Sequence, residues 1–446
     1  MVGLEAGATG IPLVTGGIGS GKTFSTEALI RALIKAGCPM LVTCVKVDEY
    51  ARYRRICEEL GCLDRLRRIT PERTGIDLMA QLLRDGTPAD AASFLMNLSD
   101  IEKASSGGDN AAFWRNLEEG AIRYSILLCV LTGRPPSLDN LYAVILSAPN
   151  LPNQDVPDKD GNVNQEYQFE QPLAGRMRLF PELMRLLYQQ TQRGKNIAEF
   201  NRIKKFFMAE MCAERVHGPC VAGINGLLGR LIDQPLRNAL TQTTLSLKAI
   251  EAKGLIAVID YPLMRYHTAG RLYACIWVML MQRYLMNRDA SKIKQPLVIV
   301  RDEAGWTLHG EFDMKANNTL RSQKVCDIAL VQCLDTLERS LGGKMAHHEA
   351  MALASNHMHK LLFQNYSGST NKWASEMGGM YREVQVSSGN QEAQDFAGKA
   401  LGARTPSWSL SYQNLIRPED FTRLPVGVAV LMSGGRVEVV DFRRGS

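Results

Sequence analysis

Short apolar runs alternate with amphipathic segments at both ends of the chain. The runs are rich in valine, isoleucine and leucine, as buried strands are, and lie at residues 11–15, 39–45, 255–260, 297–300 and 328–331. Apolar positions at helical spacing follow two of these runs, at 24–36 and 267–287. Strands that alternate with helices predict a mainly parallel sheet covered on both faces, the α/β class.

Three further runs near the C-terminus predict additional strands, at residues 360–363, 426–432 and 437–442. The last two are separated by Ser433-Gly434-Gly435, a sequence typical of a turn. We therefore expect a terminal hairpin.

The pattern changes between residues 78 and 240, where strand-like runs nearly vanish and helical periodicity dominates. Amphipathic helices are predicted at residues 113–131, 138–146, 179–192 and 197–216. This region therefore predicts an all-α domain inserted in an α/β core. The core would consist of residues 1–77 and 241–446, with the insertion at 78–240.

A complete phosphate loop of the form G-x-x-x-x-G-K-[ST] follows the first predicted strand. It consists of Gly16, Gly17, Ile18, Gly19, Ser20, Gly21, Lys22 and Thr23. A strand, a glycine-rich turn and a helix allow backbone N–H groups to surround a phosphate chain at a helix N-terminus. Lys22 would then reach the β- and γ-phosphates of a nucleotide such as ATP, and the Thr23 hydroxyl would bind Mg²⁺.

A second chemical element follows the predicted strand at residues 297–300. The strand leads through Arg301 into Asp302 and Glu303, which is the Walker-B arrangement. Asp302 would hold Mg²⁺ directly or through water, and Glu303 would polarise the attacking water. An apolar run that ends in acids is a weak signal alone, but together with the phosphate loop it predicts a nucleotide hydrolase.

Other polar residues follow predicted strands. Gln332 comes after the run at 328–331, where it would sense the γ-phosphate or orient water, or alternatively would be a hydrogen-bonded glutamine at a strand end. Residues 46–50 follow the second strand, at the edge where open α/β sheets bind ligands, although such charged residues are equally typical of a solvated helix start. The arginines between 52 and 68 indicate a solvated helical face, or alternatively contacts to a nucleic-acid backbone.

Composition limits the cellular setting. The chain has 446 residues, a net charge of +6 and a pI near 8.7, a mildly basic balance compatible with nucleic acid. Its ten cysteines include no C-x-x-C pair, which favours reduced thiols in a cytosolic compartment. Because no apolar run reaches the roughly 18–20 residues that span a bilayer, we expect no membrane span. No signal peptide is expected either.

These features together resemble the cytosolic ATPase part of the TraG/TraD-type coupling proteins of conjugation and type IV secretion, within the FtsK/HerA group of motors. The residues that carry the resemblance occur in the same order through most of the chain, at 16–23, 46–50, 113–116, 136–141, 235–238, 254–262, 300–304 and 415–425. The phosphate loop is generic, whereas the ordered set is much more specific.

The resemblance implies a RecA-like nucleotide-binding core with an all-α insertion, assembled as a homo-hexamer that uses ATP to move DNA. The DNA would be single-stranded, with an attached relaxase, and type IV secretion components would be the other partners. By resemblance, Asp302 and Glu303 form the Walker-B pair, Gln332 is the glutamine of the next core strand, and Arg321 is offered to a neighbouring subunit's nucleotide. Recruitment to the inner face of the cytoplasmic membrane is also implied.

Two features depart from the family pattern. Members usually begin with membrane-spanning helices, and the second strand often ends in Asp-x-Lys, where this chain has Cys44-Val45-Lys46. Three other functions remain open: an ATPase of the same superfamily that secretes protein, a docking receptor in which ATP only orders the ring, and a small-molecule kinase.

Overall fold

The computed structural model describes residues 12–102, 111–150, 179–320, 322–342, 345–394 and 400–445. Nine strands form one sheet, in the order β11-β10-β7-β1-β6-β5-β2-β4-β3. The strands from β7 to β3 run parallel to one another, whereas β10 pairs antiparallel with β7 and β11 antiparallel with β10. Their bounds are β1 Pro12–Thr15, β2 Met40–Cys44, β3 Leu66–Ile69, β4 Ile256–Asp260, β5 Leu297–Arg301, β6 Val325–Val331, β7 His359–Phe363, β10 Val428–Ser433 and β11 Arg436–Asp441.

Helices cover both faces of this sheet, because successive strand residues point to opposite sides. Val14 packs in a cluster with Ile30 of α1 and Tyr53 of α2, whereas its neighbour Leu13 packs on the other side with Leu334 of α14. The helices that flank the sheet are α1 Lys22–Lys35, α2 Glu49–Glu59, α12 Leu263–Met286, α13 Gly310–Leu320, α14 Leu334–Leu341, α15 Ala346–Asn356, α16 Gly368–Gly378 and α17 Pro418–Arg423. The predicted mainly parallel α/β sheet is therefore confirmed.

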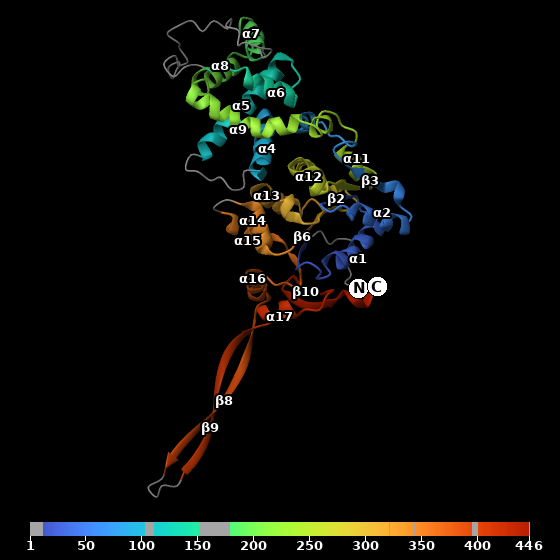
Figure 1. Ribbon diagram of the computed structural model, residues 1–446, viewed down its shortest axis with the longest axis vertical. Helices are drawn as coiled ribbons and strands as arrows, with labels where there is room; N and C mark the ends of the chain where they lie inside the picture. Colours follow the sequence, from blue (N-terminus) through green and yellow to red (C-terminus); the bar gives the residue numbers. More distant parts are fainter. Residues whose placement is uncertain are drawn as a thin grey trace.

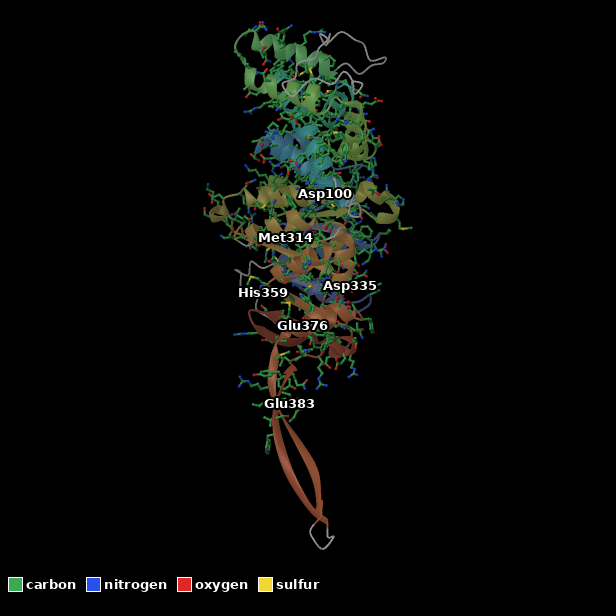
Figure 2. The ribbon with its side chains drawn as sticks, turned by 90° about the vertical axis from the view of Figure 1, so that its left-hand side faces the viewer. Asp100, Met314, Asp335, His359, Glu376 and Glu383 are labelled. Atoms are coloured by element: carbon green, nitrogen blue, oxygen red, sulfur yellow. The ribbon has the colours of Figure 1, made fainter. Side chains whose placement is uncertain are left out.

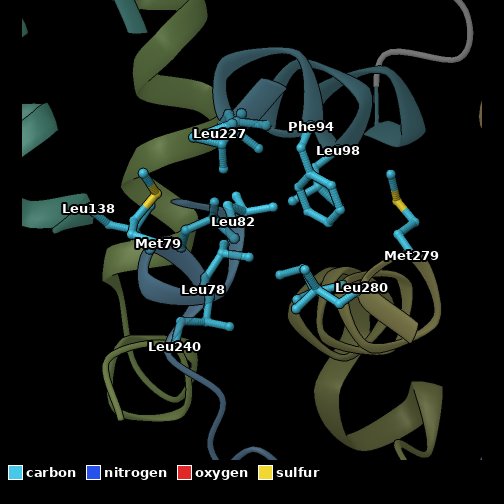
Figure 3. Close-up of a cluster of buried hydrophobic side chains, with 14 of the residues drawn as sticks. Leu78, Met79, Leu82, Phe94, Leu98, Leu138, Leu227, Leu240, Met279 and Leu280 are labelled. Carbon is cyan, nitrogen blue, oxygen red and sulfur yellow. The ribbon is translucent and has the colours of Figure 1, made fainter. Parts of the chain in front are cut away.

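Between β3 and β4, which are neighbours in the sheet, the described chain is helical. Its helices are α3 Leu78–Arg84, α4 Pro88–Glu102, α5 Ala111–Thr132, α6 Leu138–Leu146, α7 Leu179–Thr191, α8 Ile197–Lys205, α9 Glu214–Ile232, α10 Leu236–Ala239 and α11 Leu247–Ala252. Most of them form a bundle at one end of the molecule (Figure 1). Buried side chains of α3, α4 and α9 meet α12 of the core, as the close-up of Leu82, Phe94 and Leu280 illustrates (Figure 3).

A long two-stranded hairpin extends from the opposite end of the molecule (Figure 1). Its strands are β8 Met380–Gln394 and β9 Ala400–Asn414, paired antiparallel along their full length. The sequence patterns had predicted no strands here. In contrast, the predicted terminal hairpin is confirmed, since β10 pairs with β11 across the turn at Gly434.

Two other interpretations of the sequence were wrong in detail. The basic segment is α-helical only as far as Glu59 and makes a 3-10 turn at Leu63–Arg65. Arg67 and Arg68 lie on β3, an edge strand, where both are exposed between buried Leu66 and Ile69, and Arg68 donates to the buried Asp260 at 2.8 Å. The helix predicted at 197–216 is interrupted by a π-helical turn, Phe206–Glu210, before α9 begins. No helix among the described residues is long and apolar enough to cross a membrane.

Candidate nucleotide-binding site

The phosphate loop connects the end of β1 with the start of α1, as the sequence predicted. Two hydrogen bonds attach it to the sheet: the Gly16 N–H donates to the Gln332 carbonyl at 3.2 Å, and the Gly17 N–H donates to the Gln364 carbonyl at 2.7 Å. These bonds join the loop to the residues that directly follow β6 and β7. β6 and β7 are the strands on either side of β1.

Glycine is required at the end of this loop. Gly21 has φ 93°, in the region that favours glycine, and a Cβ there would lie 2.7 Å from the Gly427 backbone nitrogen. Gly19 also has a positive φ, of 77°. The backbone can therefore turn sharply and present the first N–H groups of α1 to an anion.

Lys22 lies over the loop that precedes it. Its Nζ donates hydrogen bonds to the carbonyls of Gly16 and, at 3.0 Å, Gly17. Burial lowers the pKa of Lys22, and the negative charges of Glu303 and Asp302 oppose that shift. Thr23, the next residue, is exposed in the first turn of α1. Both predicted phosphate-loop side chains therefore stand at the same end of the helix.

Asp302 and Glu303 follow β5 directly. Glu303 has the left-handed conformation φ 49°, ψ 56°, which is strained for a residue with a side chain. Its N–H donates to Asp302 Oδ1 at 3.1 Å. The sharp turn separates the two carboxylates: Asp302 is buried, whereas Glu303 is half-buried.

Two residues after β2 complete the polar cluster. The buried carboxylate of Glu49, at the start of α2, accepts hydrogen bonds from the backbone N–H groups of Val45, at 2.8 Å, and Lys46, at 3.2 Å. Lys46 Nζ lies 3.5 Å from Glu303 Oε1 and 3.7 Å from Glu49 Oε1. Lys46 therefore pairs with both carboxylates, despite the departure from the family pattern at Cys44.

The buried carboxyl groups influence one another's protonation. Burial and the neighbouring Asp302 raise the pKa of Glu49 to about 8. Burial would also raise the pKa of Asp302, but interaction with Glu49 and the positive charges of Lys46 and Arg52 lower it below its usual value. The pair consequently favours a protonated Glu49 beside an ionised Asp302 near neutral pH.

Gln332 joins the loop to the acids. Its Nε2 lies 3.4 Å from both carboxylate oxygens of Glu303, and its carbonyl accepts hydrogen bonds from the Gly16 N–H and from Asn365 Nδ2, the latter at 2.9 Å. The Gln332 side chain is therefore placed to contact a ligand bound between Lys22 and Glu303. Arg321, the remaining predicted catalytic residue, lies outside the described residues.

The donor set fits a nucleotide with a hard cation. Asp302 is kept ionised by its neighbours, and Ser20 Oγ in the loop is buried without a hydrogen-bond partner among the described residues. Carboxylate and hydroxyl oxygens are the ligands that Mg²⁺ prefers. The contacts of Asn365 and Gln364 with this site could not be predicted, because neither residue belongs to a motif.

One family of known proteins matches part of the sequence. Residues 296–426, which include both acids and Gln332, match the family described as "TraM recognition site of TraD and TraG". No curated protein matches the sequence of the chain.

Solved structures share the fold over nearly the whole chain. The unbound bacterial conjugative coupling protein TrwBdeltaN70 has a TM-score of 0.64 at 13% identity, covering 98% of this chain and 84% of its own. Plasmid coupling protein TrwB in complex with ADP and Mg2+ has a TM-score of 0.62 at 15% identity, covering 98% and 86%. VirB4 of Thermoanaerobacter pseudethanolicus has a TM-score of 0.53 at 12% identity, covering 97% and 88%.

The chain therefore shares the RecA-like α/β fold of these solved structures. The family match over residues 296–426 confirms the resemblance to the TraG/TraD-type coupling proteins.

Proposed function

We propose that this protein is an ATP-hydrolysing motor that couples a DNA or nucleoprotein substrate to a conjugation or type IV secretion channel and pumps it. The observation that carries the proposal is the convergence of Lys22, Glu303 and Gln332 at one end of the sheet, in a chain whose segment 296–426 matches the coupling family. The nucleotide complexes of TrwB support ATP and Mg²⁺ as the ligands.

Each side chain would have a separate task. The N–H groups of residues 16–23 would bind the phosphate chain, and the Lys22 ammonium would leave the carbonyls of Gly16 and Gly17 to contact the β- and γ-phosphates. Thr23 and Asp302 would hold Mg²⁺, which neutralises charge on these phosphates. The opposed shifts in the pKa values of Glu49 and Asp302 keep Asp302 ionised for this role.

Glu303 and Gln332 would act on the attacking water. Glu303 would accept its proton while Lys46, 3.5 Å from Oε1, holds the carboxylate in place. Gln332 already bridges Glu303 and the loop, so it would orient the water relative to the γ-phosphate. Arg321 would supply a positive charge to the nucleotide of a neighbouring subunit, which requires a ring, proposed to be a homo-hexamer.

The division of the chain follows this assignment. Residues 1–77 and 241–446 would form the nucleotide-binding domain, and 78–240 the inserted all-α domain. The bounds of α3, which begins at Leu78, and α10, which ends at Ala239, support it. We place the protein in the cytoplasm, recruited to the inner face of the membrane by its channel partner, with a relaxase-bound single strand as cargo.

Steady-state ATP hydrolysis tests the proposal, measured with and without single- and double-stranded DNA across protein concentration. A motor predicts turnover that DNA stimulates and that rises cooperatively with protein, with Glu303→Gln as the inactive control. DNA affinity should fall steeply with salt. ATP binding without DNA-dependent turnover would contradict DNA pumping and favour the alternatives, a protein-secretion ATPase or a docking receptor.

A further inference from the structure

The long hairpin β8–β9 has one apolar and one polar face. Residues directly opposite each other in an antiparallel pair lie on the same face. One face therefore carries the pairs Val384 with Leu410 and Arg382 with Tyr412, together with Met380 and Trp408. The other face is mainly polar and carries the pairs Glu383 with Ser411, Gln385 with Ser409 and Tyr381 with Gln413.

The apolar face is open to solvent. Trp408 is 69% exposed, Leu410 68% and Tyr412 61%, while Met380 and Val384 on the facing strand are 64% and 54% exposed. Arg382 lies with its guanidinium 5.8 Å from the centre of the Tyr412 ring, on the same face. Exposed apolar side chains that are contiguous mark an interaction surface. An isolated two-stranded hairpin is also only marginally stable in water, so packing against a partner would stabilise it. We call this surface, formed by Met380, Val384, Trp408, Leu410 and Tyr412, the ribbon face.

The base of the hairpin is fixed to the core. Asn414 Nδ2 donates to Ser375 Oγ at 2.8 Å, Ser375 Oγ donates to the Ile416 carbonyl at 2.6 Å, and the Leu415 N–H donates to the Gly379 carbonyl at 2.9 Å. These bonds join the hairpin to α16 and to the chain leading into α17. The hairpin therefore projects in a set direction beyond Glu376 (Figure 2).

The net charge of the hairpin indicates which class of partner it binds. Residues 380–414 contain three cations, Arg382, Lys399 and Arg404, and three anions, Glu383, Glu392 and Asp395, so their net charge is 3 − 3 = 0. The +6 of the chain thus lies entirely outside the hairpin. Nucleic acid and anionic lipid bind surfaces that carry an excess of cations, and this neutral surface carries no such excess. A second copy of the same surface meets no electrostatic repulsion.

We propose that the ribbon face packs against the ribbon faces of neighbouring copies of this chain, so that the hairpins form a collar with an apolar interior. The inference rests on the association of copies in the proposed function. In a closed cyclic assembly every hairpin makes the same angle with the symmetry axis, and equivalent residues of neighbours lie at the same level along it. Apolar faces that meet there exclude water from Trp408, Leu410 and Tyr412.

Cysteine cross-linking of the full chain tests this packing. Of the ten cysteines, all but the partly exposed Cys62 and Cys333 are buried, so the parent carries Cys62→Ser and Cys333→Ser. In that parent we expect Leu410→Cys to form an intermolecular disulfide under mild oxidation at least tenfold faster than Ser411→Cys. Ser411 is the matched control because it lies at the same level on the polar face. Equal rates for both variants would overturn the proposal.

A second measurement uses substitutions on the exposed side chains, with sedimentation as the readout. Val384→Ser with Leu410→Ser should weaken self-association at least tenfold, whereas Gln385→Ala with Ser409→Ala should leave it unchanged. Retained ATP binding shows that both variants are folded. If the Val384/Leu410 variant instead loses binding to single-stranded DNA or to neutral lipid vesicles and self-associates normally, the second-copy assignment is wrong.

The two proposals fail in distinguishable ways. If copies complement one another's ATPase defects but Leu410→Cys does not cross-link preferentially, the shared active site stands and the collar does not. If Leu410→Cys cross-links preferentially without such complementation, the collar stands without the shared site.

Discussion

The guanidinium of Arg301 donates a hydrogen bond of 2.7 Å to Asp313 Oδ1, although both side chains are buried. Arg301 also donates to both carboxylate oxygens of Asp327, through Nε at 3.0 Å and through a second nitrogen at 2.5 Å. Asp313 in turn accepts from Gln282 Nε2 at 2.8 Å and from the His309 N–H at 2.6 Å. This network holds the side chain of Arg301, the residue immediately before Asp302, in one position.

We predict that Asp327→Ala strongly destabilises the protein, because it leaves the buried Arg301 with a single carboxylate partner. Breaking a buried ion pair on one side costs about 3–5 kcal/mol. Urea unfolding should register this loss, and ATP turnover should fall with it, since Asp302 follows Arg301 directly. Glu58→Ala is the control: it removes the exposed pair with Arg54 and should cost about 0–1 kcal/mol. Similar losses in both variants would contradict the argument.

Nucleotide binding should depend on the Lys22 side chain. We expect Lys22→Ala to lower ATP affinity at least about tenfold, because a phosphate contact is lost from a site whose backbone remains intact. Lys35→Ala, at the far end of the same helix, is the matched control and should bind ATP normally. Fluorescent-nucleotide titration measures both. Unchanged affinity in the Lys22 variant would remove the loop from the proposed mechanism.

The sequence predicted the central strands and the phosphate loop because their information is local. Buried strands such as β2 and β5 are continuous apolar runs, and the loop is a contiguous motif. It did not predict β3, since Arg67 and Arg68 face solvent on a short edge strand and interrupt the apolar pattern. The hairpin β8–β9 was missed although 408–412 alternates apolar and polar residues, because its strands pair across a long separation without a tight-turn motif near those residues.

The site was predictable only where a strand end coincided with a motif. Lys46 and Glu49 were placed at the correct edge of the sheet, but the sequence could not distinguish a buried carboxylate from a solvated helix start. Burial of Glu49 depends on backbone N–H groups of the preceding turn, and the partners of Arg301 lie on two different elements. Such contacts depend on tertiary structure and leave no periodic signal.

Gln332 should affect turnover more than binding. Because Nε2 lies 3.4 Å from both Glu303 oxygens, Gln332→Ala should slow hydrolysis about 10–100-fold while ATP affinity stays within about twofold. Gln364→Ala is a suitable control, since its carbonyl still holds the Gly17 N–H and its side chain bonds only to the Thr422 carbonyl. Single-turnover kinetics separates the two steps. A loss of binding with normal single-turnover rate would contradict the assignment.

Stability without nucleotide should fall as pH rises through the range of Glu49. Burial and the neighbouring Asp302 raise its pKa from the ordinary 4.5 to about 8, so the folded state binds more protons than the unfolded state between these values. The free energy of unfolding therefore decreases as pH rises across this window, and Glu49 loses its proton at about pH 8. Glu49→Gln should remove this contribution and flatten the dependence.

The measurement is the thermal midpoint between pH 5 and 9, in a chelating buffer. We expect the wild-type midpoint to fall by a few degrees relative to Glu49→Gln at the alkaline end. Glu58→Gln on the exposed side of the same helix should follow the wild-type curve. Parallel curves for all three proteins would show that Glu49 titrates normally.

Hydrolysis should be restored by mixing two inactive variants if Arg321 acts on a neighbouring subunit. Lys22→Ala cannot bind its own nucleotide but still offers Arg321, whereas Arg321→Ala binds nucleotide but lacks the cation. In a mixed ring some intact sites receive Arg321 from the Lys22 variant, so turnover should exceed the sum of the separate rates. The Lys22→Ala/Arg321→Ala double variant mixed with Arg321→Ala is the control, because no subunit then supplies the cation. Full hydrolysis by Arg321→Ala alone, or no gain on mixing, would contradict a shared site.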